Sequence, residues 1–420
     1  MKMVCLSRKF RIILLCAIVL LAAACSHSQT VMTSTTEVPM VRLDPHQFPE
    51  FYDDLDLVGL KYTIEQTLRY LADLSADHPF VFGSDIYSTG HMMRSLDRFG
   101  GFLGTQPTRR QLNRFIGRNY RVYRSVGGKQ TGKMLFTGYF EPALRGSLTP
   151  DDEYRYPVYT RPADLITIDL SGFSEKYQGE KLTGRIEGQQ FVPYYDRRQI
   201  DRREGFDPSP RTVLLWVNDR IDLFFLQIQG SGKVYLKDGR AVNLHYQSAN
   251  GRPYRSIGKL LIEQGKIDAS RMSMQEIRTY LESHPEEVDA VLNYNPSYVF
   301  FQIAAEGPRG YLDVLLTPGR SLAVDRRILP MTALSYIATR KPLVDGSGRI
   351  DTWMACRRFT VCQDTGGAIR GPGRADLFWG SGAYAEIAAG HMRSPGELYF
   401  LVLKPEKLEA ANARWRLSRK

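Results

Sequence analysis

Short apolar runs, each bounded by glycine or proline, most limit the fold open to this 420-residue chain. Runs of four to eight residues rich in Val, Ile, Phe, Tyr and Leu are typical of β-strands. We expect strands at 135–140, 212–217, 223–228, 298–303, 321–325, 359–362, 375–379 and 397–403. Strands this short and scattered favour barrels over a doubly wound parallel sheet. The length allows two domains, and a hydrophobic content of 43% is that of a globular protein.

Helical periodicity is strongest before residue 125 and between 255 and 292. Apolar residues repeat on one helical face in two places, at Leu60, Ile64, Leu68, Leu71 and Leu74, and again at Leu112, Phe115 and Ile116. Ser273 and Glu276 form a capping-box pattern that predicts the start of a later helix. We therefore expect helices around a mainly β core.

The first residues predict export. Four basic residues precede an apolar run over 12–24, which fits a secretory signal and is too short to span a membrane. Ala22-Ala23-Ala24 before Cys25 resembles a bacterial lipoprotein cleavage site, with an ordinary signal peptide and a chance cysteine as the alternative. We expect a lipoprotein signal peptide at 1–24, lipid on Cys25 and a tether over 25–50, which would anchor the chain to a membrane. Ser26 resembles a sorting signal for the periplasmic face of the outer membrane.

The charge of the chain favours anionic partners. Removing residues 1–24 takes away four basic residues and lowers the formal net charge from +11 to +7. Murein, anionic lipid and nucleic acid all suit a basic protein, but the export signal argues against nucleic acid.

Two cysteines remain beyond Cys25, namely Cys356 and Cys362. In an oxidising periplasm they could form a disulfide. Two buried thiols on neighbouring strands are an equal alternative.

A glycine-rich segment over 363–380 carries the most informative chemistry. Asp364 precedes Thr365-Gly366-Gly367, and Asp376 precedes Leu377-Phe378-Trp379. A carboxyl group beside apolar side chains can stay protonated near neutral pH and act as a general acid. Arg374 lies on the same strand face as Asp376 if side chains alternate there, and its positive charge would favour the ionised carboxylate.

Several familiar motifs are missing or fail. The chain has no Gly-x-x-x-x-Gly-Lys-[Ser/Thr], Gly-x-Ser-x-Gly or His-Glu-x-x-His pattern. Ser256 and Lys259 match Ser-x-x-Lys, but no Lys-Thr-Gly follows and an apolar run flanks the match, so we interpret it as chance. Asp364-Thr365-Gly366 matches one half of an aspartic-protease pair, which would require Asp376 as the partner carboxylate.

Seven stretches between about 130 and 405 together resemble the membrane-bound lytic murein transglycosylase A family. They are FTGYFEP at 136–142, 184–185 with 193–194, FFLQIQGSG at 224–232, NPSYVFF at 295–301, LTPGRSLAVD at 316–325, the 364–380 segment and 385–391. Each is moderate evidence alone, and their shared order argues against a chance match.

The resemblance implies a mainly β fold, in which a double-psi β-barrel domain with N-terminal helices is interrupted by a second β-rich domain. The barrel domain would take 51–142 and 296–410 and the insertion 143–295, with a glycan groove between them. The barrel would use every expected strand except 212–217 and 223–228.

The implied reaction is non-hydrolytic cleavage of the β-1,4 bond between N-acetylmuramic acid and N-acetylglucosamine in peptidoglycan, leaving a 1,6-anhydro end. The C6 hydroxyl of the sugar would attack, so that one acid that later accepts its proton suffices. The expected class is an exo-acting peptidoglycan lytic transglycosylase, a carbon–oxygen lyase, although the residues leave cleavage within strands open. No metal or cofactor is implied, and a wall-remodelling complex is a candidate partner.

The resemblance also assigns residues. Asp376 would be the catalytic acid. From the local residues rather than from the resemblance, we expect Asp364 to be a scaffold, its pKa depressed by the Gly366-Gly367 backbone, or to contact substrate directly, and Asp325 to fix a turn before Arg326 and Arg327. The two glycines would let a sugar approach the backbone. Thr137, Tyr139, Gln229 and Ser231 would line the groove, with a buried Tyr139 and a turn at 230–232 as alternatives.

Two other functions stay open. A non-catalytic peptidoglycan-binding or wall-loosening module could use a related barrel, but it needs no acid beside apolar side chains. An aspartic protease is the third choice.

Overall fold

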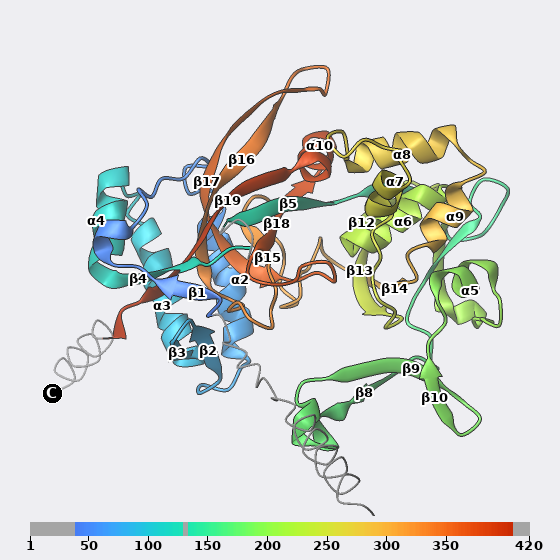
Figure 1. Cartoon of the computed structure of the whole chain (residues 1–420), viewed down its shortest axis with the longest axis horizontal. Helices are drawn as coiled ribbons and strands as arrows, with labels where there is room; N and C mark the ends of the chain where they lie inside the picture. The colour runs from blue at the N-terminus through green and yellow to red at the C-terminus, as the bar shows by residue number, and fades with distance from the viewer. Residues whose placement is uncertain (1–37, 129–132, 406–420) are drawn as a thin grey trace, which may run out of the picture. The chain divides into compact units, whose positions relative to one another are not determined.

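The computed structural model describes residues 38–128 and 133–405 (Figure 1). The predicted signal peptide over 1–24, the lipidation residue Cys25 and the first part of the predicted tether lie outside these ranges. Within them, no helix is long and apolar enough to cross a membrane.

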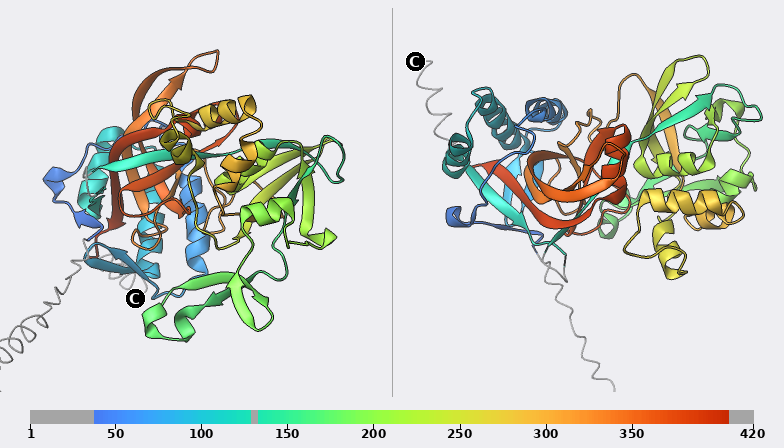
Figure 2. Two further views of the ribbon diagram at one scale, coloured as in Figure 1. Left: turned by 45° about the vertical axis from the view of Figure 1, so that its right-hand side comes forward. Right: turned by 90° about the horizontal axis from the view of Figure 1, so that it is seen from above.

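Eight strands form the larger sheet. Their order is β1 (Met40–Arg42), β4 (Tyr120–Ser125), β19 (Arg393–Leu403), β16 (Leu334–Val344), β17 (Ile350–Asp364), β15 (Ser321–Ala323), β18 (Arg374–Ser381) and β5 (Met134–Glu141). Because β19 also pairs with β5, the last six strands close into a barrel, whose orange and red strands curve round in Figure 2. The mainly β class, with a barrel and a second β-rich domain, is confirmed.

Three N-terminal helices pack on the barrel as expected. They are α2 (Leu60–Ala72), α3 (Thr89–Leu103) and α4 (Arg109–Asn119), with a hairpin of β2 (Pro79–Phe82) and β3 (Asp85–Ser88) between the first two. Ile64 and Phe99 belong to the same apolar cluster as barrel residues, and the rings of Phe99 and Phe359 lie 5.4 Å apart. The Leu60 and Leu112 periodicities therefore mark core-facing helices.

The second domain contains two further sheets. The six-stranded sheet has the order β14 (Val299–Ala304), β13 (Ala241–Ala249), β12 (Ser231–Leu236), β6 (Ala143–Ser147), β11 (Val213–Val217) and β7 (Tyr156–Tyr159). The three-stranded sheet has the order β10 (Gln190–Pro193), β9 (Lys181–Glu187) and β8 (Ile166–Asp169). The helices of this region are α5 (Arg197–Arg202), α6 (Arg220–Gln229), α7 (Ile257–Glu263), α8 (Met274–Ser283) and α9 (Val288–Asn293). Ser273 caps α8 as predicted, its side chain accepting from the Glu276 N–H.

The two domains also touch through helices. Gln275 on α8 donates from Nε2 to the carbonyl of Glu386 at 3.0 Å, on α10 (Ala383–His391). Ala385 and Ala388 of α10 pack in the barrel cluster. This helix therefore bridges the barrel core and the second domain.

Three predictions about elements are wrong. The run 223–228 is helix α6. The strand near 298–303 exists as β14, but it pairs with β13 in the second sheet, so the chain re-enters the barrel only at β15. The tether does not extend to residue 50, because β1 pairs with β4 and buries Met40. The predicted boundaries at 142 and 296 otherwise stay a prediction.

Buried ion pairs connect Asp53 and Asp54, which precede α2, to the barrel. Arg320 is fully buried and donates two hydrogen bonds to Asp53, from Nη1 at 2.6 Å and from Nη2 at 2.8 Å. Arg358 holds Asp54 in the same forked way, at 2.8 and 2.6 Å. Lys341 also donates to Asp54, from Nζ at 2.6 Å. Removing either partner of the Asp53–Arg320 pair would leave an unpaired buried charge, so these contacts fix the start of the folded chain.

Cys356 and Cys362 are both buried free thiols. They lie on the single strand β17, six residues apart, which separates them by roughly 20 Å. That span is too long for a disulfide. The buried-thiol alternative is therefore confirmed, although the thiols share one strand. Burial raises the pKa of Cys356 to about 11 and that of Cys362 to about 12.

Candidate active site

Strand β15 brings the three predicted aspartates together. It lies between β17 and β18, and its residue Ala323 is the register partner of Asp364 on β17 and of Asp376 on β18. Asp325 follows two residues further along the chain. Residues separated by up to 51 positions thus surround one strand end because of the barrel's strand order.

Asp376 is held from two directions. Thr137 on β5, its register partner, donates a hydrogen bond from its hydroxyl to Oδ1. Arg374 donates from Nε to Oδ1 at 3.2 Å and from Nη2 to Oδ2 at 3.3 Å, which confirms that the two side chains share a strand face. The Asp376 side chain keeps 15% of its surface exposed. The carboxyl is therefore oriented by donors while remaining accessible.

The apolar neighbours of Asp376 differ from the expectation. Leu377 points to the opposite face of β18 and is fully buried in the barrel core. Only Phe378 shares the side of the strand on which Asp376 lies, and its ring packs 5.2 Å from that of Tyr139. The immediate surroundings of the carboxyl are therefore the polar groups of Thr137 and Arg374.

At Asp364, burial outweighs hydrogen bonding in setting the pKa. Its pKa is raised to about 6, chiefly by burial and further by the negative charge of Asp376, although hydrogen-bond donors act in the opposite direction. Oδ1 accepts from the N–H of Thr365 at 2.8 Å and from the N–H of Tyr311 at 2.9 Å. The expected depressed pKa is wrong, because desolvation outweighs these donors.

Asp325 shows the opposite balance. It is 1% exposed, which acts to raise its pKa, but Arg327 and the Gly371 N–H outweigh burial and lower the pKa to about 2. Arg327 donates from Nη2 at 2.7 Å and Gly371 donates at 2.8 Å, both to Oδ2. Asp325 therefore ties the chain after β15 to the glycine-rich loop, as a turn-fixing residue would.

Gly366 and Gly367 form the turn after β17 but do not hold Asp364. The Gly366 carbonyl accepts from the Ile369 N–H at 3.0 Å, which closes the turn. A side chain added at Gly367 would meet nothing within 4 Å, so open space lies beside it. That openness agrees with the predicted close approach of a ligand.

Thr137 and Tyr139 point to the same face of β5. On the paired strand β18, the Asp376 carboxyl lies on this same side of the sheet. The Tyr139 hydroxyl is buried and has no hydrogen-bond partner that meets normal geometry among the described residues. Burial raises its pKa well above the usual value, and the nearby negative charges of Asp364 and Asp376 add to the shift. Tyr139 thus lies beside both carboxyls, with its hydroxyl buried and the residue as a whole only partly buried.

Gln229 and Ser231 lie where α6 turns into β12. The Gln229 Oε1 accepts from the Phe140 N–H at 3.0 Å, so this side chain joins the second domain to β5. Gly230 ends α6 with φ +80°, and Ser231 is 5% exposed at the start of β12. No hydrogen bond among the described residues connects Gln229 or Ser231 to the three aspartates.

Two nearby residues were missed. Tyr311 supplies the backbone donor to Asp364, and the charges of Arg374 and Asp376 act on the pKa of Tyr254, which burial chiefly raises. Both residues lie in loops without periodicity, so the sequence carries no signal for them. Ser256 near Tyr254 is the N-cap of α7 and accepts from the Lys259 N–H at 3.2 Å, which accounts for the Ser-x-x-Lys match.

Two family models match this arrangement. The MltA specific insert domain matches residues 135–302, and the 3D domain matches residues 320–402, which contain all three aspartates. The fold and the match define the class of lytic murein transglycosylases.

Relatives narrow the class further. The membrane-bound lytic murein transglycosylase A of Vibrio cholerae is 32% identical over 68% of this chain and 69% of its own length, and that of Escherichia coli K12 is 32% identical over 68% and 70%. A lytic murein transglycosylase structure from Agrobacterium tumefaciens superposes with a TM-score of 0.71 at 30% identity, over 89% of this chain and 99% of the other. E. coli MltA with bound chitohexaose superposes at 0.66 with 25% identity, over 87% and 95%. The chain belongs to the membrane-bound lytic murein transglycosylase A family.

Proposed function

We propose that this protein is a peptidoglycan lytic transglycosylase that cleaves the β-1,4 bond between N-acetylmuramic acid and N-acetylglucosamine and leaves a 1,6-anhydro end. The observation that carries the proposal is the Asp376 carboxyl, held by Thr137 and Arg374 beside two further aspartates. The relatives named lytic murein transglycosylase A, and the chitohexaose bound to one of them, support glycan as substrate.

Asp376 serves as acid and then as base in this proposal. Its carboxyl proton passes to the glycosidic oxygen as the bond from that oxygen to C1 of the muramic acid breaks. The C6 hydroxyl of the same sugar attacks C1, and its proton returns to the Asp376 carboxylate. The acid is regenerated, no water is consumed, and attack within one sugar benefits from its fixed orientation.

The neighbours of Asp376 have separate roles. Thr137 and Arg374 orient the carboxyl and stabilise it as it becomes ionised. Asp325 and Asp364 position the loop and strand on which Asp376 depends, and Tyr139 lies beside the reacting carboxyl. We assign glycan contacts to Gly366, Gly367, Gln229 and Ser231 as substrate-supporting residues.

An aspartic protease is a weaker candidate. No hydrogen bond joins Asp364 to Asp376 among the described residues, whereas aspartic proteases share a proton between two adjacent carboxylates. The ion pair of Asp376 with Arg374 also favours separate carboxyls.

The products of digestion test the function. Purified sacculi are incubated with the protein, or with the Asp376→Asn variant, and the released fragments are identified by mass spectrometry. We expect 1,6-anhydro ends from the parent and none from the variant. Reducing ends would mean hydrolysis, and binding without release would support the peptidoglycan-binding or wall-loosening alternative.

We also propose that Cys25 carries lipid and anchors the protein at the periplasmic face of the outer membrane. The lipoprotein-like residues 22–25 and the membrane-bound naming of the relatives support this proposal. A Cys25→Ala variant should move from the membrane fraction to the soluble periplasmic fraction, and continued membrane association would contradict the anchor.

A further inference from the structure

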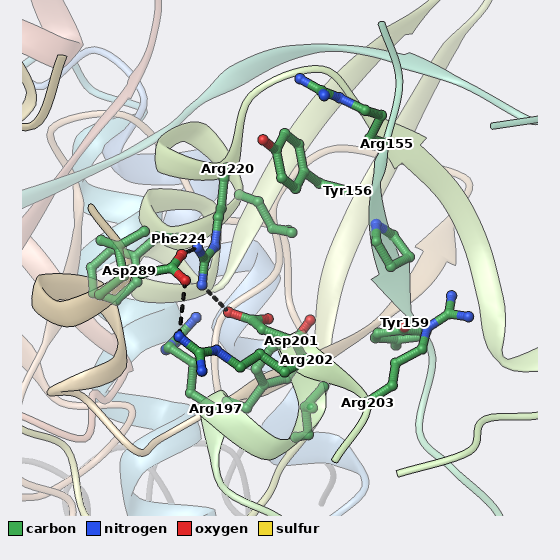
Figure 3. A pocket seen from close by; sticks show the side chains of 15 residues that line it. Arg155, Tyr156, Tyr159, Arg197, Asp201, Arg202, Arg203, Arg220, Phe224 and Asp289 are labelled. Atoms are coloured by element: carbon green, nitrogen blue, oxygen red, sulfur yellow. Dashed lines mark hydrogen bonds and ion pairs between the residues drawn. The ribbon is translucent and has the colours of Figure 1, made fainter. Parts of the chain in front are cut away.

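A cavity of about 420 Å³ lies in the second domain, outside the aspartate cluster. Five arginines and two aspartates line it, together with tyrosines from β7 (Figure 3). The arginines are Arg155, Arg197, Arg202, Arg203 and Arg220. A cavity with this excess of positive charge suits an anionic ligand.

The two aspartates form ion pairs with two of the arginines. Arg220 pairs with Asp289 and donates from Nη2 to Asp201 at 3.1 Å. Arg202 donates to Asp289 at 3.1 Å. Within 38–128 and 133–405, the other three arginines of the cavity form no ion pair with a carboxylate.

Arg197 is the most informative of the three. It is 2% exposed, and within the described part of the chain its guanidinium donates only to backbone carbonyls, from Nε to Asn295 at 3.0 Å and from Nη2 to Ser297 at 2.7 Å. The Phe224 ring lies 4.6 Å from the guanidinium carbon. Burial lowers the pKa of Arg197, and the charge of Asp201 offsets this only in part, so an anion in the cavity would further stabilise the charged form.

Arg155 and Arg203 add two accessible guanidiniums. Arg203 ends α5 with φ +55°, an unfavourable backbone for a side chain of this kind, and its charge acts on the Tyr159 hydroxyl. A carboxylate accepts hydrogen bonds, and planar guanidiniums together with tyrosine hydroxyls can donate them.

We propose that this cavity binds a carboxylate of the stem peptide of peptidoglycan, an inference that rests on the proposed function. Carboxylates of peptidoglycan lie on its peptides, whereas the sugar backbone near the cut is uncharged. The charges of Arg197, Arg374 and Asp376 all act on Tyr254, so the cavity arginine and the catalytic carboxyl share a neighbouring tyrosine. The cavity would recognise peptide-bearing glycan strands.

Calorimetry with defined probes tests the proposal. The full chain is titrated with the free stem tetrapeptide, with the same peptide amidated at every carboxylate, and with inorganic phosphate. We expect the free peptide to bind and the amidated peptide to bind at least about tenfold more weakly. Binding of phosphate with no binding of the peptide would overturn the stem-peptide assignment.

The Arg203→Gly variant separates recognition from folding. Glycine suits the positive φ at this position, so removing the guanidinium should leave the melting temperature within a few degrees and weaken peptide binding about tenfold or more. Gln106→Gly is the matched control, because Gln106 also has a positive φ, of 50°, but lies in a loop after α3. Unchanged binding by Arg203→Gly would contradict the proposal.

The outcome can be separated from that of the catalytic proposal. Peptide binding with no 1,6-anhydro product would support the cavity and reject the catalytic function. Product formation without peptide binding would reject the cavity alone.

Discussion

The barrel and the second domain treat buried charge differently. In the barrel, the buried guanidiniums of Arg320 and Arg358 each meet a carboxylate through two hydrogen bonds. In the second domain, the buried guanidinium of Arg197 donates only to carbonyls among the described residues and packs on aromatic rings beside a cavity, with the charge of Asp201 acting on it without an ion pair. Paired charges build structure, whereas a buried charge left without a counterion marks a place where a ligand can supply one.

Two carboxyls of the barrel strands depart from this pattern, Asp364 on β17 and the buried Glu141 at the end of β5. Asp364 is the one that lies in the aspartate cluster. It forms no ion pair among the described residues, and burial chiefly raises its pKa to about 6. It also lies in the candidate active site. Asp364 and Arg197, two buried charged groups without an ion pair among the described residues, thus occur at the sites to which we assign function.

Breaking a barrel pair should give the largest change in stability. Arg320→Met leaves Asp53 buried without its partner, so we expect the free energy of unfolding to fall by about 3–5 kcal/mol. Denaturant titration measures it. Arg349→Met is the control, because Arg349 is 83% exposed in its pair with Asp345 and should change stability by less than about 0.5 kcal/mol. Similar losses in the two variants would reject the distinction.

Asp325 should give an intermediate change. Its pKa is lowered to about 2 because Arg327 and Gly371 outweigh burial, so its contribution is complete above pH 3.8 and disappears as the pH falls toward 2. We expect Asp325→Asn to lose about 2 kcal/mol at neutral pH and to show a flatter stability profile between pH 2 and 4. The exposed Asp351 supplies the control substitution Asp351→Asn. A parallel profile in parent and variant would contradict the account.

Asp364 should give the smallest change, with the opposite sign. The folded chain binds its proton up to pH about 6, whereas the unfolded chain releases it near 3.8, so the free energy of unfolding falls as the pH rises through this range. Asp364→Asn should remove that fall and stabilise the protein by about 1 kcal/mol at pH 7, given partial solvent contact. Thermal melts at pH 4 and 7 measure it, and destabilisation at pH 7 would show that Asp364 is charged and paired.

Helix α6 shows where sequence patterns fail. Leu223 and Leu226 pack into the cluster beneath the six-stranded sheet, while Phe224 and Phe225 pack into the cluster of the neighbouring helices. A helix buried on both sides has no polar face, so its apolar run resembles a strand. Strand β14 fails differently. Its residues predict a strand correctly, but tertiary packing determines that it pairs with β13 and not with a barrel strand.

The site was more predictable than its electrostatics. Asp376, Thr137 and Arg374 followed from a motif and from strand alternation, and the structure brings them into contact. The pKa direction of Asp364 did not follow, because it depends on burial and on Tyr311, 53 residues away. Asp53 and Arg320 are 267 positions apart, so no local sequence pattern predicts their ion pair.

The rate of product release by Asp376→Asn is the most direct test of the central claim. The initial rate of formation of 1,6-anhydro ends from sacculi is compared for the parent, Asp376→Asn and the control Asp351→Asn, with circular dichroism to confirm folding. We expect Asp376→Asn to be slower by about 10³-fold or more and the control to match the parent. A folded Asp376→Asn variant that works within about tenfold of the parent would contradict the assignment of Asp376 as the acid.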